Sequence, residues 1–499
     1  MLSPGSVPRN YRLLPILLTS FGAMVASVAA AMGPLGGGPW MMLILVAFWS
    51  GALLAGWLLV ERDFLGLATV FLTFFFPMLL DFQVYEPDYP PPWLAGLMPG
   101  LVISARDLFL IVVATVWMVD LAVGNEVESK RIGWPARWIS LFLICGLMFP
   151  IHTVDLQRSA INWFELFRRA LAFAYIAKRV HDKKLLQWIV WGMMAHVWLE
   201  TLIAGLQYAT GSSLGLDFLG EQRGIMEFTT TGGAIPRAGG LLIHPNQLAA
   251  YLVIVGPVIL AMCLRRQSLL SYVIHWATFG AVNLSLLITF SRTAWGVAAV
   301  AYLVTYHLVQ RRYGRPWILS FFIPIILAAI AGLLLILLVE DVRDRLFMPD
   351  HGSGELRKYQ FLGAFEIIQH YHLIGTGTGN YLGGIMHVWP YGNPADQNTY
   401  IYQVHNGSLL MTAEFGLIGG IAYHGFFITC MLRCWKAWQW KDDFLALLGT
   451  GLLVGFATWF AKSQYNVHTL LNDPCSWLQL ALMLSVSNAA VRMAKSPNP

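Results

Sequence analysis

Long apolar runs separated by short polar segments dominate the pattern of this 499-residue chain. A helix needs about 17 to 25 mainly apolar residues to cross a bilayer. The clearest runs lie near residues 13–32, 40–60, 64–80, 100–123, 185–209, 241–264, 271–290, 317–339, 406–432, 444–462 and 474–491. Shorter or charge-bearing runs lie near 138–152, 159–177 and 293–309. Together they predict an all-α polytopic membrane protein with about 12 to 14 spanning helices.

Composition agrees with this pattern and excludes other classes of protein. Hydrophobic residues make up 57% of the chain and charged residues 12%, whereas a soluble domain carries about 25% charged residues. The mean hydropathy of +0.60 also excludes a disordered chain. The net charge of +5 does not indicate nucleic acid, because Lys and Arg form short clusters between the apolar runs. Membrane lipids are therefore expected partners, and nucleic acid is not.

The distribution of Lys and Arg predicts the orientation in the membrane. Most of them fall in one set of alternate loops, which should therefore face the cytoplasm. Three other segments then lie on the outer face: residues 81–99, residues 210–240 and the long stretch 340–405. A loop as long as the third is uncommon unless it is functional. Its apolar periodicity predicts a helix from about residue 355 to 369, lying along the outer membrane surface.

Three arginines on the outer face run against this charge bias. Arg237 lies at the mouth of a span, Arg292 interrupts an apolar stretch of nearly 40 residues, and Arg357 lies on the predicted loop helix. A guanidinium kept there suggests an anionic partner such as a phosphate, which it can grip with two hydrogen bonds. The alternatives are contact with lipid headgroups for Arg292 and simple solvation for Arg357. His244 and Asn246 follow Arg237, and either a cap or a site role fits them.

The segment QVHNGSLLMTAEFGLIGG closes the long loop and begins a span. His405 and Asn406 stand at the start of this helix, and Glu414 lies about two turns further on. An imidazole near a positive helix end stays neutral and can act as a general base toward a hydroxyl, although a capping role is the alternative. The histidines lack the spacing typical of a metal site, so we expect neither a metal nor another cofactor.

Charged residues inside apolar runs also require an explanation. Glu200, Arg168 and Arg169 lie within predicted spans, where a charge usually faces an interior cavity or a partner. Glu165 precedes the two arginines by three and four residues, so an ion pair along one helix face is the simplest interpretation for them.

Four blocks in this order resemble the O-antigen ligase and O-antigen polymerase superfamily of bacterial membrane glycosyltransferases. They are RAGGLLIHPNQLA, TFSRTAW, the loop helix leading into LIGTGTGNY, and HNGSLLMTAEFGLIGG. Together they cover roughly residues 235 to 425, and the first half of the chain matches only in hydropathy. The sequence departs from the family pattern at His372, where Pro is frequent, and at Thr293, where small residues are frequent.

The resemblance implies a GT-C-type helical membrane fold in the bacterial inner membrane, with its active site facing the periplasm. Such a protein takes glycan from undecaprenyl pyrophosphate and passes it to the hydroxyl of an acceptor glycan or lipid, without a metal ion. Carried over by motif, Arg237, Arg292 and Arg357 would bind the pyrophosphate and His405 would activate the acceptor. Asn246, Asn406 and Glu414 would complete the substrate site.

The resemblance also suggests three parts of the chain: helices at residues 1–235, an O-antigen ligase-like core at 236–434 that includes loop 340–405, and helices at 435–499. Polymerisation of an exopolysaccharide or O-antigen is the activity we favour. Ligation to lipid A core and transfer to protein remain open, as do the sugar, the linkage and the acceptor. A lipid-linked oligosaccharide flippase or other transporter is the alternative from another class, and a scaffold for polysaccharide export is a third.

Overall fold

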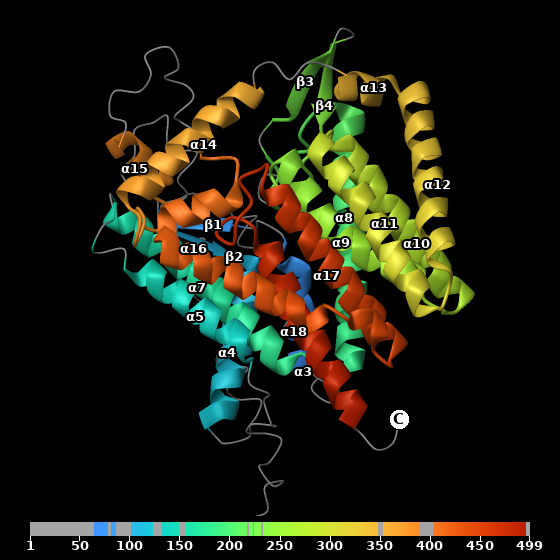
Figure 1. Cartoon of the computed structure of the whole chain (residues 1–499), viewed down its shortest axis with the longest axis horizontal. Helices are drawn as coiled ribbons and strands as arrows, with labels where there is room; N and C mark the ends of the chain where they lie inside the picture. Colours follow the sequence, from blue (N-terminus) through green and yellow to red (C-terminus); the bar gives the residue numbers. More distant parts are fainter. Residues whose placement is uncertain are drawn as a thin grey trace, which may run out of the picture.

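The computed structural model describes residues 64–77, 81–85, 101–122, 132–148, 151, 153, 155–216, 219–222, 224–230, 233–347, 353–388 and 403–495. The spans predicted near 13–32 and 40–60 lie outside the described residues. Helices make up most of the described structure, so the all-α prediction is confirmed (Figure 1). Two antiparallel hairpins are the only strands among the described residues.

The bounds of the helices follow the apolar runs closely. The helices are α3 (Phe64–Phe75), α4 (Ala105–Ala122), α5 (Trp134–Leu147), α7 (Leu156–Arg179), α8 (Lys183–Thr210), α9 (Pro245–Cys263), α10 (Leu269–Ile288), α11 (Arg292–Arg312), α12 (Trp317–Leu338), α13 (Glu340–Phe347), α14 (Ser353–His370), α15 (Tyr381–Val388), α16 (Gly407–Cys434), the short 3-10 helix η4 (Ala437–Gln439), α17 (Asp443–Ser463) and α18 (Pro474–Lys495). Among the described residues, 5 helices are long and apolar enough to cross a membrane: α8, α9, α10, α16 extended through η4, and α17. The protein is therefore a multi-pass membrane protein, and the count of 12 to 14 spans stays a prediction.

Short strands occur where the apolar pattern alone predicts loops or a span. The predicted span near 100–123 begins with strand β2 (Leu101–Ser104), which pairs with β1 (Asp81–Tyr85), and the helix starts only afterwards. The outer segment 210–240 contains the hairpin of β3 (Met226–Thr230) and β4 (Gly233–Arg237). The β-branched and aromatic residues of these segments favour strands once a partner is present. The helix predicted near 100–123 therefore begins only at Ala105, and neither pair of strands was predicted from the sequence.

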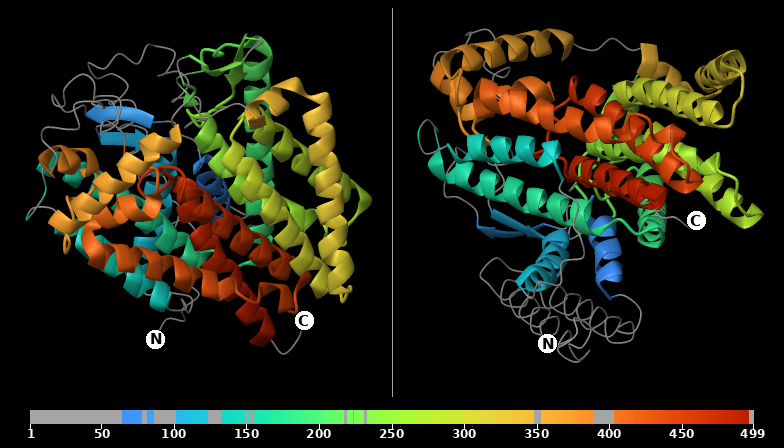
Figure 2. Two further views of the ribbon diagram at one scale, coloured as in Figure 1. Left: turned by 45° about the horizontal axis from the view of Figure 1, so that its top comes forward. Right: turned by 60° about the horizontal axis from the view of Figure 1, so that its bottom comes forward.

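The long outer segment contains more helix than the sequence predicts. The predicted helix is confirmed as α14, while α13 and α15 were not expected. Gln360, Ala364 and Ile367 face the protein, whereas Leu362 and Phe365 of the predicted apolar stripe are about half exposed, at 47% and 50%. Helix α14 packs on α15 and α16, and the right view of Figure 2 shows it on the side of the bundle opposite α3 and α4.

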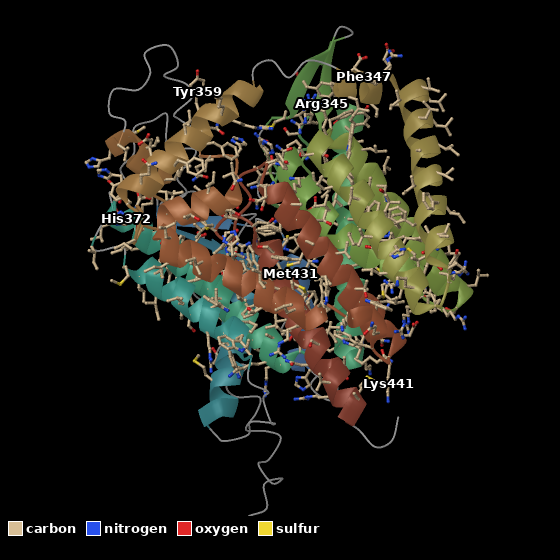
Figure 3. The ribbon with its side chains drawn as sticks, in the orientation of Figure 1. Arg345, Phe347, Tyr359, His372, Met431 and Lys441 are labelled. Atoms are coloured by element: carbon tan, nitrogen blue, oxygen red, sulfur yellow. The ribbon has the colours of Figure 1, made fainter. Side chains whose placement is uncertain are left out.

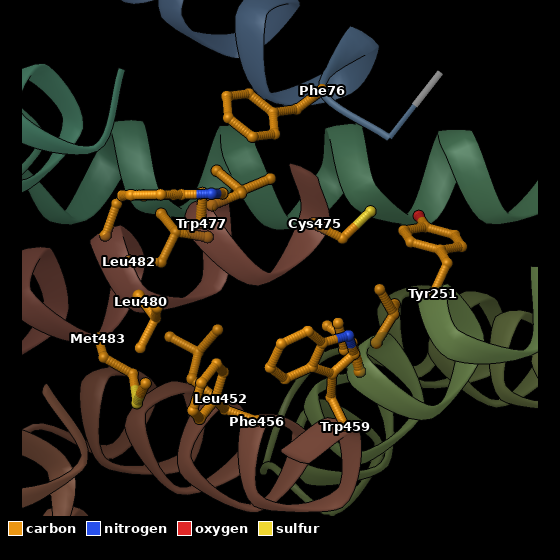
Figure 4. Packing of buried hydrophobic residues seen from close by; sticks show 14 of the residues in the cluster. Phe76, Tyr251, Leu452, Phe456, Trp459, Cys475, Trp477, Leu480, Leu482 and Met483 are labelled. Carbon is orange, nitrogen blue, oxygen red and sulfur yellow. The ribbon is translucent and has the colours of Figure 1, made fainter. Parts of the chain in front are cut away.

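Helix α9 lies at the centre of the bundle and packs on α17, α10 and α11. Close packing with α17 depends on two glycines one turn apart, because a Cβ at Gly451 would lie 2.6 Å from Val258 Cα and one at Gly455 2.2 Å from Ile254 O. Small residues at such spacing let helix backbones approach in a membrane, where packing rather than the hydrophobic effect drives association. Figure 4 shows the aromatic core beside this contact.

Helix α16 is broken at Gly416, whose φ of 71° is in the left-handed region that favours glycine. The break frees backbone groups, and the glycine-rich segment that follows α14 satisfies them. The amide of Thr376 donates to Ala413 O at 3.0 Å, and the amide of Leu417 donates to His372 O at 2.9 Å. Helix α16 thus loses hydrogen bonds of its own at the break and gains hydrogen bonds to the outer segment, which fix the two elements together.

Candidate functional site

Arg237 ends strand β4 and is anchored to two other elements. Its Nε donates to Thr289 O at 3.0 Å, in the link between α10 and α11, and its Nη2 donates to Asn246 Oδ1 at 3.3 Å, in the first turn of α9. The next amide, of Ala238, donates to Ile288 O at 3.2 Å and fixes the end of the strand against α10. Both side-chain partners of Arg237 are neutral oxygens, so they orient the guanidinium without cancelling its charge.

Two further arginines lie close to Arg237. Arg292 is the first residue of α11, and Arg345 lies on α13, which Figure 3 shows at the β3–β4 end of the molecule. Arg345 Nε donates to Phe290 O at 3.1 Å, and its guanidinium lies 5.0 Å from the centroid of the Phe228 ring. Burial, followed by the charges of Arg345 and Arg292, lowers the pKa of Arg237 to about 10. Arg237 therefore remains cationic near neutral pH, and the repulsion from its two neighbours favours an anion beside it.

His244 precedes α9 and caps it. Its Nδ1 accepts a hydrogen bond from the amide of Asn246 at 2.9 Å, so the capping interpretation is confirmed for this histidine. Burial lowers the pKa of His244 to about 4, with smaller contributions from the charges of Arg237, Lys462 and His405. The residue is therefore neutral at physiological pH and links the cluster around Arg237 to His405 across a short distance.

Lys462, on the last turn of α17, is fully buried. Its Nζ donates to Asn246 O at 3.0 Å and to His468 Nε2 at 2.9 Å. The close packing of α9 and α17 brings this lysine under the turn that holds Asn246, and Asn246 in turn contacts Arg237. Lys462 therefore connects the end of α17 to the start of α9, next to the cluster around Arg237.

His405 lies just before α16 and is held by Gln360 of α14. Gln360 Oε1 accepts from the His405 amide at 3.3 Å and pairs with His405 Nδ1 at 2.7 Å. An amide oxygen only accepts, so this pattern assigns the imidazole proton to Nδ1 and leaves the lone pair on Nε2. Burial, and then the charge of Arg357, lowers the pKa of His405. The result is a neutral imidazole with one free basic nitrogen.

Arg357 and Gln360 stand three residues apart on α14, so they share one face of that helix. Arg357 is near enough to His405 to lower its pKa. One helix of the outer segment thus supplies both a cation and the partner that orients the imidazole. Pairwise contacts and charge effects connect Arg237 to Arg292 and Asn246, Arg237 to His244, His244 to His405, and His405 to Arg357, and a shared substrate site for them stays a prediction.

The side chains of Asn406 and Glu414 form hydrogen bonds with backbone groups around this region. Asn406 caps α16, since its Oδ1 accepts from the Leu409 amide at 2.9 Å and its Nδ2 donates to Gln464 O at 3.2 Å. Glu414 is buried, and its carboxylate accepts from the amides of Gly379 at 3.0 Å and Tyr381 at 3.4 Å. These contacts hold the backbone segments around the site in place. Direct contact of either residue with substrate stays a prediction.

The charged residues predicted inside spans have structural partners. Glu165 pairs with Arg169 at 3.1 Å and with Arg168 at 3.7 Å, and Arg168 also contacts Asp107. The predicted ion pair along α7 is therefore present. Glu200 is fully buried in α8 and accepts from the Leu241 amide at 3.0 Å, so it secures the turn between Arg237 and His244.

Sequence reasoning missed Gln360, Arg345, Lys462 and His468. The charge bias that singled out Arg237 applies equally to Arg345 and Lys462, which lie at the outer ends of predicted elements, so this signal was present. Nothing in the local pattern singles out Gln360, because its importance comes from a contact with a residue 45 positions away. Within the described part of the chain, no group of three or more His, Cys, Asp or Glu residues is arranged to hold a metal ion.

Residues 276–424 match the model of a family described as O-antigen ligase. The match begins in α10 and ends in α16, and it includes Arg292, Arg357 and His405. Arg237 and Asn246 lie before it and Lys462 lies after it, although all three are in contact with the same region. No curated protein matches the chain.

Proposed function

We propose, from the match of residues 276–424 to the family described as O-antigen ligase, that the protein acts as a glycosyltransferase of the O-antigen ligase and polymerase superfamily. The protein transfers or polymerises glycan from undecaprenyl pyrophosphate onto an acceptor sugar hydroxyl at the periplasmic face of the bacterial inner membrane. The observation that carries the proposal is His405, whose Nδ1 lies 2.7 Å from Gln360 Oε1 and whose pKa is lowered by burial and then by the charge of Arg357.

The arginines suit the donor side of this reaction. When the glycosidic bond to the pyrophosphate breaks, negative charge develops on the leaving diphosphate, and fixed guanidinium groups stabilise it through charge-assisted hydrogen bonds. Arg237 and Arg292 are near each other, and Arg345 adds a third cation. Because Arg237 is held by neutral oxygens, its charge is available to the diphosphate. The reaction as proposed needs no metal ion or cofactor.

His405 suits the acceptor side. Its free Nε2 takes the proton of the acceptor hydroxyl while the hydroxyl oxygen forms the new bond to the anomeric carbon. Gln360 keeps the proton on Nδ1 and so keeps Nε2 aimed away from α14. Burial, and then the charge of Arg357, lowers the pKa of His405, so the base is deprotonated at neutral pH before the acceptor arrives.

Polymerisation of an exopolysaccharide or O-antigen remains the activity we favour, with ligation to lipid A core or to protein as the alternatives. These differ only in the acceptor, and the described residues of the site are common to all three. A flippase or transporter would use a site near the membrane midplane that opens to both sides. The clustering of the cations at one end of α9, α11 and α17 favours an enzyme over such a transporter.

The test is transfer by the purified full chain in vesicles containing undecaprenyl-pyrophosphate glycan and candidate acceptors, followed by gel analysis of the products. A ladder identifies a polymerase and a single shift a ligase. The His405→Ala variant should give neither, while His372→Ala, which removes an exposed histidine of the same outer segment, should behave as wild type. Full transfer by His405→Ala, or movement of the glycan lipid across the membrane without transfer, would contradict the proposal.

A further inference from the structure

An apolar groove with a volume of about 820 Å³ runs along the seam between α11 and α17. On α11 its wall extends as a single stripe from Thr293 to Arg311, and on α17 from Leu453 to Ala461, with Tyr465 just after that helix. The α11 wall is about 27 Å long at 1.5 Å per residue, which is close to the ~30 Å thickness of the hydrocarbon core of a bilayer. The groove is therefore as long as the membrane is thick, and its walls suit lipid chains.

Small residues create this groove. Gly296 and Ala301 on α11 face Ala457 and Ala461 on α17, so the two helices touch without filling the space between them. Val300 is 61% exposed in the structure, which means that the groove opens sideways rather than forming a closed cavity. A lipid can enter such a groove from the bilayer without any opening of the bundle.

The two ends of the groove differ in chemistry. Thr293 and Tyr465 line the end next to Arg292 and the candidate site. The opposite end is lined by Arg311 and Lys436 together with Trp435, Trp438 and Gln439. The Arg311 guanidinium lies 5.0 Å from the centroid of the Trp438 ring. Figure 3 labels Met431, which lines the groove near this end, and Lys441, which follows η4. Tryptophan and basic residues together are typical of a membrane interface.

The neighbouring cations at this end are paired with acidic side chains, whereas, in the described part of the chain, those of the groove are not. Arg312 Nε donates to Asp443 at 2.9 Å, and Lys183 pairs with Asp442 at 2.6 Å. Within the described residues, neither Arg311 nor Lys436 forms an ion pair. Two cations beside an apolar groove, without an acidic side chain between them, are complementary to an anionic headgroup with acyl chains attached.

We propose that this groove binds one anionic phospholipid, with its phosphate between Arg311 and Lys436 and its acyl chains along the stripe of α11 and α17. Acyl chains of one leaflet reach about half of the bilayer, or ~15 Å. The phospholipid therefore fills the half of the groove next to Arg311 and leaves the half next to Thr293 open. The site is separate from the proposed sugar-transfer site, because its charged end lies at the other end of α11 from Arg292.

The experiment measures lipid retained by the purified full chain after extraction from vesicles that contain equal amounts of phosphatidylglycerol and phosphatidylcholine, by native mass spectrometry. Wild type should retain one phosphatidylglycerol. Substitution of both Arg311→Gln and Lys436→Gln should lower this retention about tenfold or more, since each basic residue near the surface contributes to attraction of an anionic lipid. The matched control replaces Arg315→Gln and Lys441→Gln, which removes two exposed charges from the same end without touching the groove.

A second variant tests the groove without changing its charge. Val304→Trp fills the half next to Arg311 and should also remove the bound phospholipid, with unfolding temperature measured as a check on folding. Undiminished retention in both the charge and the filling variants would overturn the proposal. Equal retention of phosphatidylcholine would also overturn it, as would a polyprenyl lipid in place of the phospholipid.

Discussion

Arginines near the two ends of α11 have different kinds of partner. Where α11 ends, Arg312 donates to Asp443 at 2.9 Å and to the carbonyls of Trp438 and Trp440, and Arg265 lies 3.8 Å from the same aspartate. Where α11 begins, Arg237 is held by a carbonyl and an amide oxygen, next to other arginines. At the first end Arg312 and Arg265 share an acidic partner, although, among the described residues, Arg311 and Lys436 beside the groove do not. At the second end neutral oxygens orient the Arg237 guanidinium, and the proposed function needs its charge for a diphosphate.

The different partners change how a bound anion affects the free energy at each end. Like charges disfavour the protonated form of an arginine, and burial does so more strongly. Both effects lower the pKa of Arg237 to about 10, and a bound diphosphate would raise it again. The cluster is thus less stable empty than filled. The paired arginines at the other end gain nothing from an added anion, because Asp443 already satisfies them.

The largest expected effect is on His405, which lies at the end of the bundle that carries Arg237. His405→Ala should lower the transfer rate by about 10²- to 10⁴-fold, the usual contribution of a general base. The measurement is the initial rate of glycan transfer in vesicles at equal protein. His372→Ala provides the control, since it lies on the same outer segment and is exposed. A rate for His405→Ala within a factor of two or so of wild type would remove the base from the mechanism.

Arg292→Gln should lower the rate by about 10²- to 10³-fold, because removal of one fixed donor to a developing negative charge typically has this effect. Inorganic pyrophosphate should protect wild type, but not the variant, against thermal unfolding. Arg343→Gln is the matched control: it lies on α13 two residues from Arg345, but pairs with Glu340 at 2.9 Å. Equal losses in the two variants would mean that general outer charge, rather than the cluster, is responsible.

Arg312→Gln should show the opposite pattern and sharpen the comparison. It removes hydrogen bonds to Asp443 and to backbone carbonyls, and we expect the free energy of unfolding to fall by about 1 to 3 kcal/mol. The transfer rate per folded molecule should stay unchanged. Thermal unfolding in detergent and the rate assay at low temperature separate the two effects. An arginine at this end that lowered the rate without lowering stability would erase the distinction drawn between the ends.

Most of the fold could be predicted from the chain because a spanning helix leaves a long signal. The run near 444–462 became α17 at Asp443–Ser463, and that near 271–290 became α10 at Leu269–Ile288. Elements of four to eight residues, such as β2 and α13, leave too short a pattern, and their formation depends on a partner elsewhere. The break in α16 at Gly416 could not be predicted from the neighbouring residues either, because it is stabilised by hydrogen bonds to the segment after α14.

The candidate site was predictable where it contains arginines in loops that the charge bias assigns to the outer face. Arg237 and Arg292 stand out because the charge bias predicts the outer face for them, where arginine is uncommon. Gln360 does not stand out, because a glutamine on a loop helix is ordinary until His405 is seen 2.7 Å away. His244 and Asn406 illustrate the limit from the other side: both satisfy helix ends, a role that the sequence could not separate from contact with substrate.

The smallest effect is a shift in pH dependence, and it tests whether Arg357 and His405 act as one electrostatic unit. Transfer requires neutral His405, so the rate should fall only as pH drops through a pKa that lies below the ordinary value of about 6.5. The charge of Arg357 contributes to that lowering. Arg357→Gln should therefore raise the pKa and move the acid limb of kcat/KM toward neutral pH, by less than about one unit. Lys358→Gln removes an exposed neighbouring charge on the same helix and should leave the limb unmoved. Equal shifts would show that His405 senses the surface of α14 rather than a cation inside the site.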